Sequence, residues 1–95
     1  MDIADPKQAE LERLIREIPG LIERLQNEYT KFFNGAEKKP PLKLRALLDK
    51  STEQARVLLR TCQNKALMFK TQNTIARSMT YTAMWDKKLL DRERK

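Results

Sequence analysis

The sequence contains no histidine, a single cysteine and only two glycines. Without histidine, the chain lacks the side chain that most often performs acid–base catalysis near neutral pH and that most often binds transition metals. A single thiol excludes an internal disulfide and is compatible with a reducing compartment. The scarcity of glycine, together with only four prolines, argues against a β-rich fold, because such a fold needs many turn residues.

Long apolar runs are also missing. No stretch of about 18 or more apolar residues occurs, so we expect no segment that spans a membrane. The first six residues are acidic and precede no long apolar stretch, whereas a secretory signal begins basic and then becomes apolar. These two absences predict a cytoplasmic protein.

Motifs for catalysis and ligand binding are missing as well. The sequence has no glycine-rich phosphate-binding loop and no nucleophile elbow. Cys62 lies among apolar residues with no histidine to activate it, so it is expected to behave as a small hydrophobic side chain. We therefore expect a protein that is not an enzyme and that binds neither a metal nor a cofactor.

Charged residues, by contrast, are abundant, at 35% of the chain, and the formal net charge is +7. The charge is unevenly spread, because residues 1–35 carry five Lys/Arg against seven Asp/Glu, whereas residues 51–95 carry ten against four. An acidic first helix packed against a basic later helix would neutralise part of this difference. The remaining positive charge favours contact with nucleic acid.

A first helix is predicted over residues 6–34. Asp5 is a good N-cap and Pro6 suits the first helical position, while Gly35 is suited to the left-handed conformation that ends a helix. Apolar residues recur at alternating steps of four and three, which is typical of a helix that packs on neighbouring helices. They are Leu11, Ile15, Ile18, Ile22, Leu25, Tyr29 and Phe32.

Prolines mark two further features. Pro19-Gly20 lies inside the first helix, where a proline removes a hydrogen bond. The apolar stripe keeps its phase across this pair, so the sequence is consistent with either one kinked helix or two short helices joined by a tight turn. Residues 35–41 then form a connection that ends in Pro40-Pro41, and Pro41 suits the first position of the next helix.

Residues 42–92 contain neither glycine nor proline and are predicted to be helical. An uninterrupted helix would be about 80 Å long, far longer than its partner. We therefore expect a break near residues 49–52, where Ser51 and Gln54 can form a capping box. The apolar stripe that we assign to the core continues through both parts. It comprises Leu44, Leu48, Ala55, Leu58, Cys62, Ala66, Phe69, Ala76 and Ala83.

These elements predict a single all-α domain over residues 1–95. Short connections make neighbouring helices antiparallel. The expected fold class is an antiparallel helical hairpin or a three-helix bundle with coiled-coil-like packing.

Three aromatic residues, Tyr29, Phe32 and Phe33, close the first helix just before its end. One interpretation is a hydrophobic plug that covers the corner of the hairpin and the start of the next helix. The other is a docking surface for a partner peptide, because exposed aromatic side chains are strong anchors.

Arg77, Tyr81 and Trp85 are spaced four residues apart and therefore stack along one side of the last helix, well away from the apolar stripe. They either pack against the first helix or a second subunit, with Arg77 over the Tyr81 ring, or form a surface for a partner. With Lys87 and Lys88, that surface would suit single-stranded nucleic acid. A second basic cluster is expected at the other end of the long helix. It comprises Lys38, Lys39, Lys43 and Arg45.

The order of these motifs resembles that of a family of small, uncharacterised bacterial helical-hairpin proteins. The similar features are Tyr29-x-x-Phe32-Phe33-x-Gly35, then Pro40-Pro41 and Arg45, then the Arg77/Tyr81/Trp85 helix. The resemblance covers roughly residues 10–92 and is most specific from Phe32 to Pro41. It implies a helical hairpin in a bacterial cytoplasm and carries over no activity.

Two functions are consistent with these patterns. The first is a non-enzymatic protein–protein interaction module, such as an adaptor, a regulatory subunit or a self-associating structural protein, because the helices carry more apolar surface than one thin layer covers. The second is a nucleic-acid-binding helical protein that uses the basic and aromatic last helix. The first is favoured, since acidic residues mixed among the basic ones weaken the second.

Overall fold

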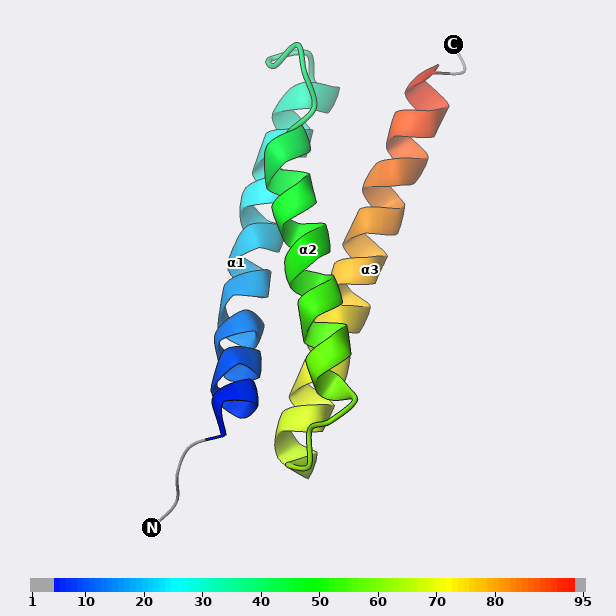
Figure 1. Ribbon diagram of the computed structural model, residues 1–95. Helices are drawn as coiled ribbons and strands as arrows, with labels where there is room; N and C mark the ends of the chain where they lie inside the picture. Colours follow the sequence, from blue (N-terminus) through cyan, green and yellow to red (C-terminus); the bar gives the residue numbers. More distant parts are fainter. Residues whose placement is uncertain (1–4, 94–95) are drawn as a thin grey trace.

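A computed structural model describes residues 5–93, which form three helices (Figure 1). Helix α1 spans Pro6–Phe33, α2 spans Leu42–Leu59 and α3 spans Lys65–Glu93. Each helix packs against both others and runs antiparallel to the one before it, so the bundle is elongated, at 59 × 18 × 16 Å. The prediction of an all-α, antiparallel three-helix bundle is confirmed. Within the described residues, no helix has both the length and the apolar character needed to cross a bilayer.

Helix α1 follows the local signals of its sequence. The Asp5 side chain caps its first turn by accepting a hydrogen bond from a backbone amide at 3.0 Å. The helix passes through Pro19-Gly20 without interruption, so the single-helix alternative is the one observed. It ends at Phe33, one residue before the predicted end, and Gly35 has a φ of 84°, as expected of the residue that closes a helix.

The predicted break near residues 49–52 is wrong, because α2 continues through them. Ser51 and Thr52 are buried inside the bundle and do not cap a new helix. The Thr52 hydroxyl donates to the Leu48 carbonyl one turn earlier, at 2.8 Å. This bond satisfies a polar side chain within a continuous helix, so these residues require no interruption.

The break lies instead at residues 60–64, between α2 and α3. Asn64 begins α3, because its side-chain oxygen accepts a hydrogen bond from the Leu67 amide at 3.0 Å, as an N-cap does. At the start of α2, Pro41 lies at the cap position and not at the first helical position predicted for it. The connection before it covers residues 34–41, close to the predicted range.

The faces of α3 differ from the prediction. Phe69 keeps 66% of its surface exposed, and Ala66, Ala76 and Ala83 are exposed as well. Their predicted place in the core is wrong, because the non-helical residues 60–64 shift the phase of the apolar stripe between α2 and α3. The buried side chains of α3 lie on a different face. They are Leu67, Thr71, Ile75, Ser78 and Trp85.

Helix α1 supplies most of the buried apolar side chains, and α2 and α3 close over it. From α1 these are Leu11, Leu14, Ile18, Leu21, Ile22, Leu25, Tyr29 and Phe32. Helices α2 and α3 also share a buried polar contact, in which the hydroxyls of Thr52 and Ser78 lie 2.8 Å apart. This contact fixes how the two helices face each other, because two buried hydroxyls must remain paired.

Candidate interaction surface

Trp85 holds α3 against α1. Its ring stacks on Tyr29 with 4.7 Å between the ring centroids, and its indole Nε1 donates to Gln26 Oε1 at 2.9 Å. Only 1% of the Trp85 surface is exposed. Of the alternatives for this residue, packing against the first helix is the one observed, so the indole is not available as a platform for bases.

Arg77 and Tyr81 continue the same side of α3. The Arg77 guanidinium lies over the Tyr81 ring, 5.9 Å from its centroid, as the packing interpretation predicts. Tyr81 is half-buried and tilted against Trp85, whereas Lys87 and Lys88 are exposed. The predicted surface of five residues is therefore divided between the core and the solvent, and does not form one continuous site.

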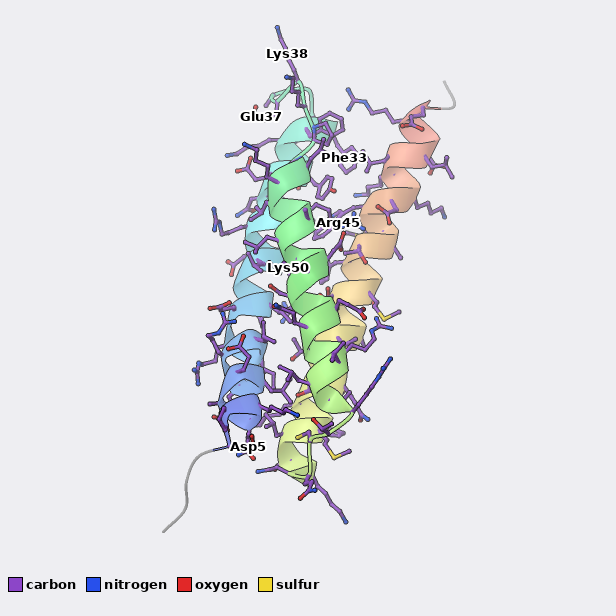
Figure 2. All side chains as sticks on the ribbon, viewed as in Figure 1. Asp5, Phe33, Glu37, Lys38, Arg45 and Lys50 are labelled. Atoms are coloured by element: carbon purple, nitrogen blue, oxygen red, sulfur yellow. The ribbon has the colours of Figure 1, made fainter. Side chains whose placement is uncertain are left out.

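The aromatic residues at the end of α1 are buried or half-buried, as the plug interpretation expects, and their ring contacts with other helices are with α3. Tyr29 and Phe32 are buried, and the half-buried Phe33 lies between α1 and α3, where it is labelled in Figure 2. Arg92 covers this plug, because its guanidinium lies 4.4 Å from the Phe32 ring centroid and donates to the Phe32 carbonyl at 3.1 Å. Lys88 lies 5.6 Å from the Phe33 ring. These aromatic rings therefore pack within the bundle, with Phe33 half-buried at its surface.

Arg45 links α2 to the other two helices. Its guanidinium donates to both carboxylate oxygens of Asp86 on α3, at 2.8 and 3.1 Å, and reaches the Tyr29 hydroxyl at 3.4 Å (Figure 2). Hydrogen bonding to this guanidinium lowers the pKa of Asp86 below its ordinary value of 3.8, against a smaller opposing effect of burial. Sequence reasoning assigns Arg45 only to a basic cluster, because no local signal points to a partner 41 residues away.

The two basic clusters lie at the same end of the bundle, and not at opposite ends as predicted. Because α2 and α3 are antiparallel, the connection with Lys38 and Lys39 lies at the end of the bundle where α3 finishes with Lys87 and Lys88 (Figures 1 and 2). All four side chains are exposed. Acidic groups accompany them, since Glu37 and Asp91 are exposed at that end too.

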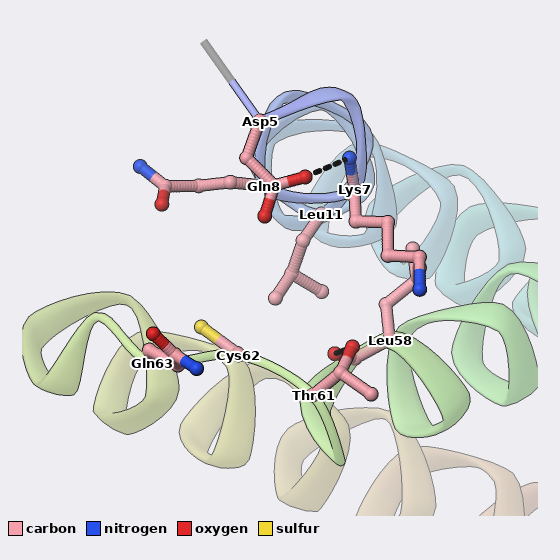
Figure 3. Close-up of a pocket in the computed structure, with 8 residues that line it drawn as sticks. All are labelled: Asp5, Lys7, Gln8, Leu11, Leu58, Thr61, Cys62 and Gln63. Carbon is pink, nitrogen blue, oxygen red and sulfur yellow. Dashed lines mark hydrogen bonds between the residues drawn. The ribbon is translucent and has the colours of Figure 1, made fainter. Parts of the chain in front are cut away.

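A small pocket lies at the opposite end, between the start of α1 and the connection from α2 to α3 (Figure 3). Asp5, Lys7, Gln8, Leu11, Leu58, Thr61, Cys62 and Gln63 line its volume of about 200 Å³. The Cys62 thiol donates to the Asn64 carbonyl at 3.6 Å, and one oxygen of the Asp5 carboxylate caps α1. Among residues 5–93, no three His, Cys, Asp or Glu side chains are grouped to hold a metal ion.

The outward side of α3 carries an apolar stripe that the bundle does not cover. We call Phe69, Ala76, Met79, Ala83 and Leu90 the outer stripe. Four of its members are spaced seven residues apart and therefore follow one face of the helix over about 31 Å. Phe69, Met79 and Leu90 keep 66%, 51% and 49% of their surfaces exposed, and both alanines are exposed.

No protein-family model, curated protein or solved structure matches this chain. The candidate site therefore depends on the geometry of the outer stripe. The predicted core stripe contains Phe69, Ala76 and Ala83 but neither Met79 nor Leu90. Its residues were assigned to the core because the position of the break before α3 decides which face of the helix turns inward.

The charge around the outer stripe has one sign over most of its length. Residues 54–85 contain five Lys/Arg and no Asp/Glu, and this segment includes the stripe from Phe69 to Ala83. All acidic residues of α3 lie in its last eight residues, at Asp86, Asp91 and Glu93. The stripe thus runs from a wholly basic region into one of mixed charge.

Proposed function

We propose that this protein is a non-enzymatic helical interaction module that binds another protein helix through the outer stripe of α3. The observation that carries this proposal is the seven-residue spacing of exposed apolar side chains on a helix whose core face is already complete. Such spacing is that of one of the two apolar positions of a coiled-coil heptad, and Met79 occupies the other position once. A helix that is apolar on two sides of its circumference needs a second neighbour.

The composition of the outer stripe suits helix packing. Burying a large side chain such as Phe69 or Leu90 contributes about 1.5–3 kcal/mol each, before the costs of association. Between them, Ala76 and Ala83 leave room for another helix to approach closely. The stripe therefore has large side chains at its ends and at Met79, with an alanine on either side of Met79, which suits the close approach of a helix.

A pair of matched alanine variants tests the proposed function. Ala83→Glu places a charge at the centre of the outer stripe, while Ala46→Glu places the same charge on an exposed face of α2. Both residues are exposed helical alanines, so both variants are expected to fold. Chemical cross-linking in cells, followed by mass spectrometry, should recover a protein partner or a second copy with the wild-type chain and Ala46→Glu, but not with Ala83→Glu. Equal recovery with both variants would contradict the proposal.

A second candidate function is binding to nucleic acid. It is favoured by the acid-free segment 54–85 and by the meeting of two basic clusters at one end of the bundle. Fluorescence anisotropy with generic single-stranded and duplex oligonucleotides tests it across a salt series. Binding to duplex DNA should weaken by about 0.9 log units per log unit of salt for each phosphate contacted, and Lys87→Gln with Lys88→Gln should reduce that slope. Absence of binding at low salt would reject this function.

A further inference from the structure

We propose that the partner helix on the outer stripe is α3 of a second copy of this chain, bound in the antiparallel direction. This inference rests on the proposed function and adds the identity and orientation of the partner. It follows from three features of the stripe: the symmetry of its spacing, the direction of the charge along α3, and the hydrogen bond that Thr80 makes within its own helix.

The spacing of four of the five residues of the outer stripe is the same in both directions. Phe69 and Leu90 are equally distant from the point between Met79 and Thr80, and so are Ala76 and Ala83. A two-fold interface requires a patch that is complementary to itself. In an antiparallel pair centred on this point, the Phe69 ring of one copy lies opposite Leu90 of the other. Ala76 then lies opposite Ala83, and Met79, next to the two-fold axis, lies opposite Thr80.

The charge of α3 favours the antiparallel direction over the parallel one. Lys65, Lys70 and Arg77 occupy the first half of the helix, and the carboxylates begin only at Asp86. A parallel pair would place two wholly basic halves side by side, which is repulsive. The antiparallel pair places each basic half beside a half of balanced charge, in which Asp86, Asp91 and Glu93 offset three basic residues.

The polar group nearest the centre of the stripe carries no large desolvation cost. The Thr80 hydroxyl lies beside the proposed two-fold axis and already donates to the Ala76 carbonyl at 2.9 Å. A hydroxyl that is satisfied within its own helix can be covered by a second helix without losing its hydrogen bond. The approach of a second α3 therefore leaves this group paired.

Sedimentation equilibrium across a concentration series tests the second copy. The wild-type chain should change from monomer to dimer as concentration rises, Ala83→Glu should remain monomeric, and Ala46→Glu should behave as the wild type. Because each copy carries a net charge of +7, added salt should strengthen the dimer by reducing repulsion. A wild-type chain that stays monomeric at all concentrations would overturn the inference. So would an Ala83→Glu variant that still dimerises.

Disulfide cross-linking tests the direction. In a Cys62→Ser background, chains with Ala76→Cys and chains with Ala83→Cys are mixed, one of them carrying a heavy-nitrogen label so that mass spectrometry separates the products. The antiparallel pair predicts mostly mixed disulfides between the two variants. Predominance of disulfides between identical variants would indicate a parallel pair and would overturn the inference.

These outcomes separate the identity of the partner from the proposed function. A monomeric chain whose cellular cross-links still depend on Ala83 would retain the interaction function and reject the second copy as its partner. A monomeric chain whose cross-links ignore Ala83→Glu would reject both proposals. Dimers that persist in Ala83→Glu would show that another surface mediates self-association.

Discussion

Trp85 is the side chain that most clearly distinguishes the two faces of α3. Its indole is buried against Tyr29 and hydrogen-bonded to Gln26, whereas the Phe69 ring, on the other face, is largely exposed. The energetic consequences should differ accordingly. Removing a buried aromatic ring leaves a cavity, while removing an exposed one changes little in the isolated chain.

We predict that Trp85→Ala lowers the free energy of unfolding by about 3–5 kcal/mol, because cavity formation and lost apolar burial combine. Phe69→Ala should change it by less than about 0.5 kcal/mol. Both values are measured by urea unfolding, followed by circular dichroism at a protein concentration that keeps the chain monomeric. A larger loss for Phe69→Ala than for Trp85→Ala would reverse the assignment of the two faces.

The buried hydroxyls of Thr52 and Ser78 give a second prediction for single residues. Thr52 donates to the Leu48 carbonyl, so Ser78 must donate to Thr52. Thr52→Val leaves Ser78 buried without an acceptor and should cost about 1–3 kcal/mol, while Ser78→Ala leaves the Thr52 bond intact and should cost about 0.5–1.5 kcal/mol. The double variant should cost less than the two single changes together by about 1 kcal/mol. Additive values from chemical denaturation would show that the hydroxyls do not interact.

At the scale of the elements, the start of α3 decides which residues turn inward. Asn64 is the signal that sets it, since its side chain caps the first turn. Asn64→Ala should lower the free energy of unfolding by about 1 kcal/mol. Gln63→Ala, the loss of the neighbouring exposed amide, is the matched control and should have almost no effect in the same thermal unfolding measurement. Equal losses for both variants would argue against the cap.

The ion pair between Arg45 and Asp86 connects α2 to α3 and should make stability depend on pH. The pKa of Asp86 is lower in the folded chain than its ordinary value of 3.8, so the contribution of the pair is complete above that pH. It is lost as the pH falls through the lower, folded-state pKa. For this half-exposed carboxylate, Asp86→Asn should cost about 0.5–1 kcal/mol at neutral pH.

This pair is tested by measuring the unfolding free energies of the wild type and of Asp86→Asn over a pH series from about 6 to about 2. Their difference in unfolding free energy should shrink toward the acidic end, because the wild-type carboxylate becomes protonated there. Asp91→Asn, an exposed carboxylate on the same helix, is the control and should show a smaller difference. A difference for Asp86→Asn that stays constant over this range would mean that the charge of the carboxylate is not involved.

The elements differ in how far their sequence predicts them. The limits of α1 were predictable because Asp5 and Gly35 act on the backbone beside them. The limits of α2 and α3 were not, because residues 60–64 contain neither glycine nor proline and Asn64 is a weak signal by itself. An error in the position of this break changes the phase of α3. Residues of the exposed candidate surface were therefore assigned to the core face of α3.

Contacts between distant residues account for what else the sequence did not predict. Arg45 belongs to a basic cluster in the sequence, yet it is bound to Asp86 on another helix. The two basic clusters lie far apart along the chain, yet the antiparallel fold brings them to one end. In both cases, the directions of the helices decide which charged groups lie near one another, and these directions are defined only in the complete bundle.

At the scale of the whole molecule, α3 has an apolar face that the other two helices leave uncovered. Three helices bury one face of α3, while its outer stripe remains exposed beside a segment that contains no acidic residue. This arrangement is the basis of our proposal that the chain associates through α3. The net positive charge of each copy should oppose association at low salt. At higher salt this repulsion is screened, so the proposed dimer should be more stable.

Thiol labelling at two positions of α3 tests the assignment of its faces and its association together. In a Cys62→Ser background, Ala76→Cys places a thiol on the outer stripe, and Ser78→Cys places one on the buried face. In dilute protein, Ala76→Cys should react rapidly and Ser78→Cys slowly. At high concentration the rate for Ala76→Cys should fall, while that for Ser78→Cys stays the same. A slow reaction of Ala76→Cys in dilute protein would contradict the exposed face, and a rate that is independent of concentration would contradict its contact with a second copy.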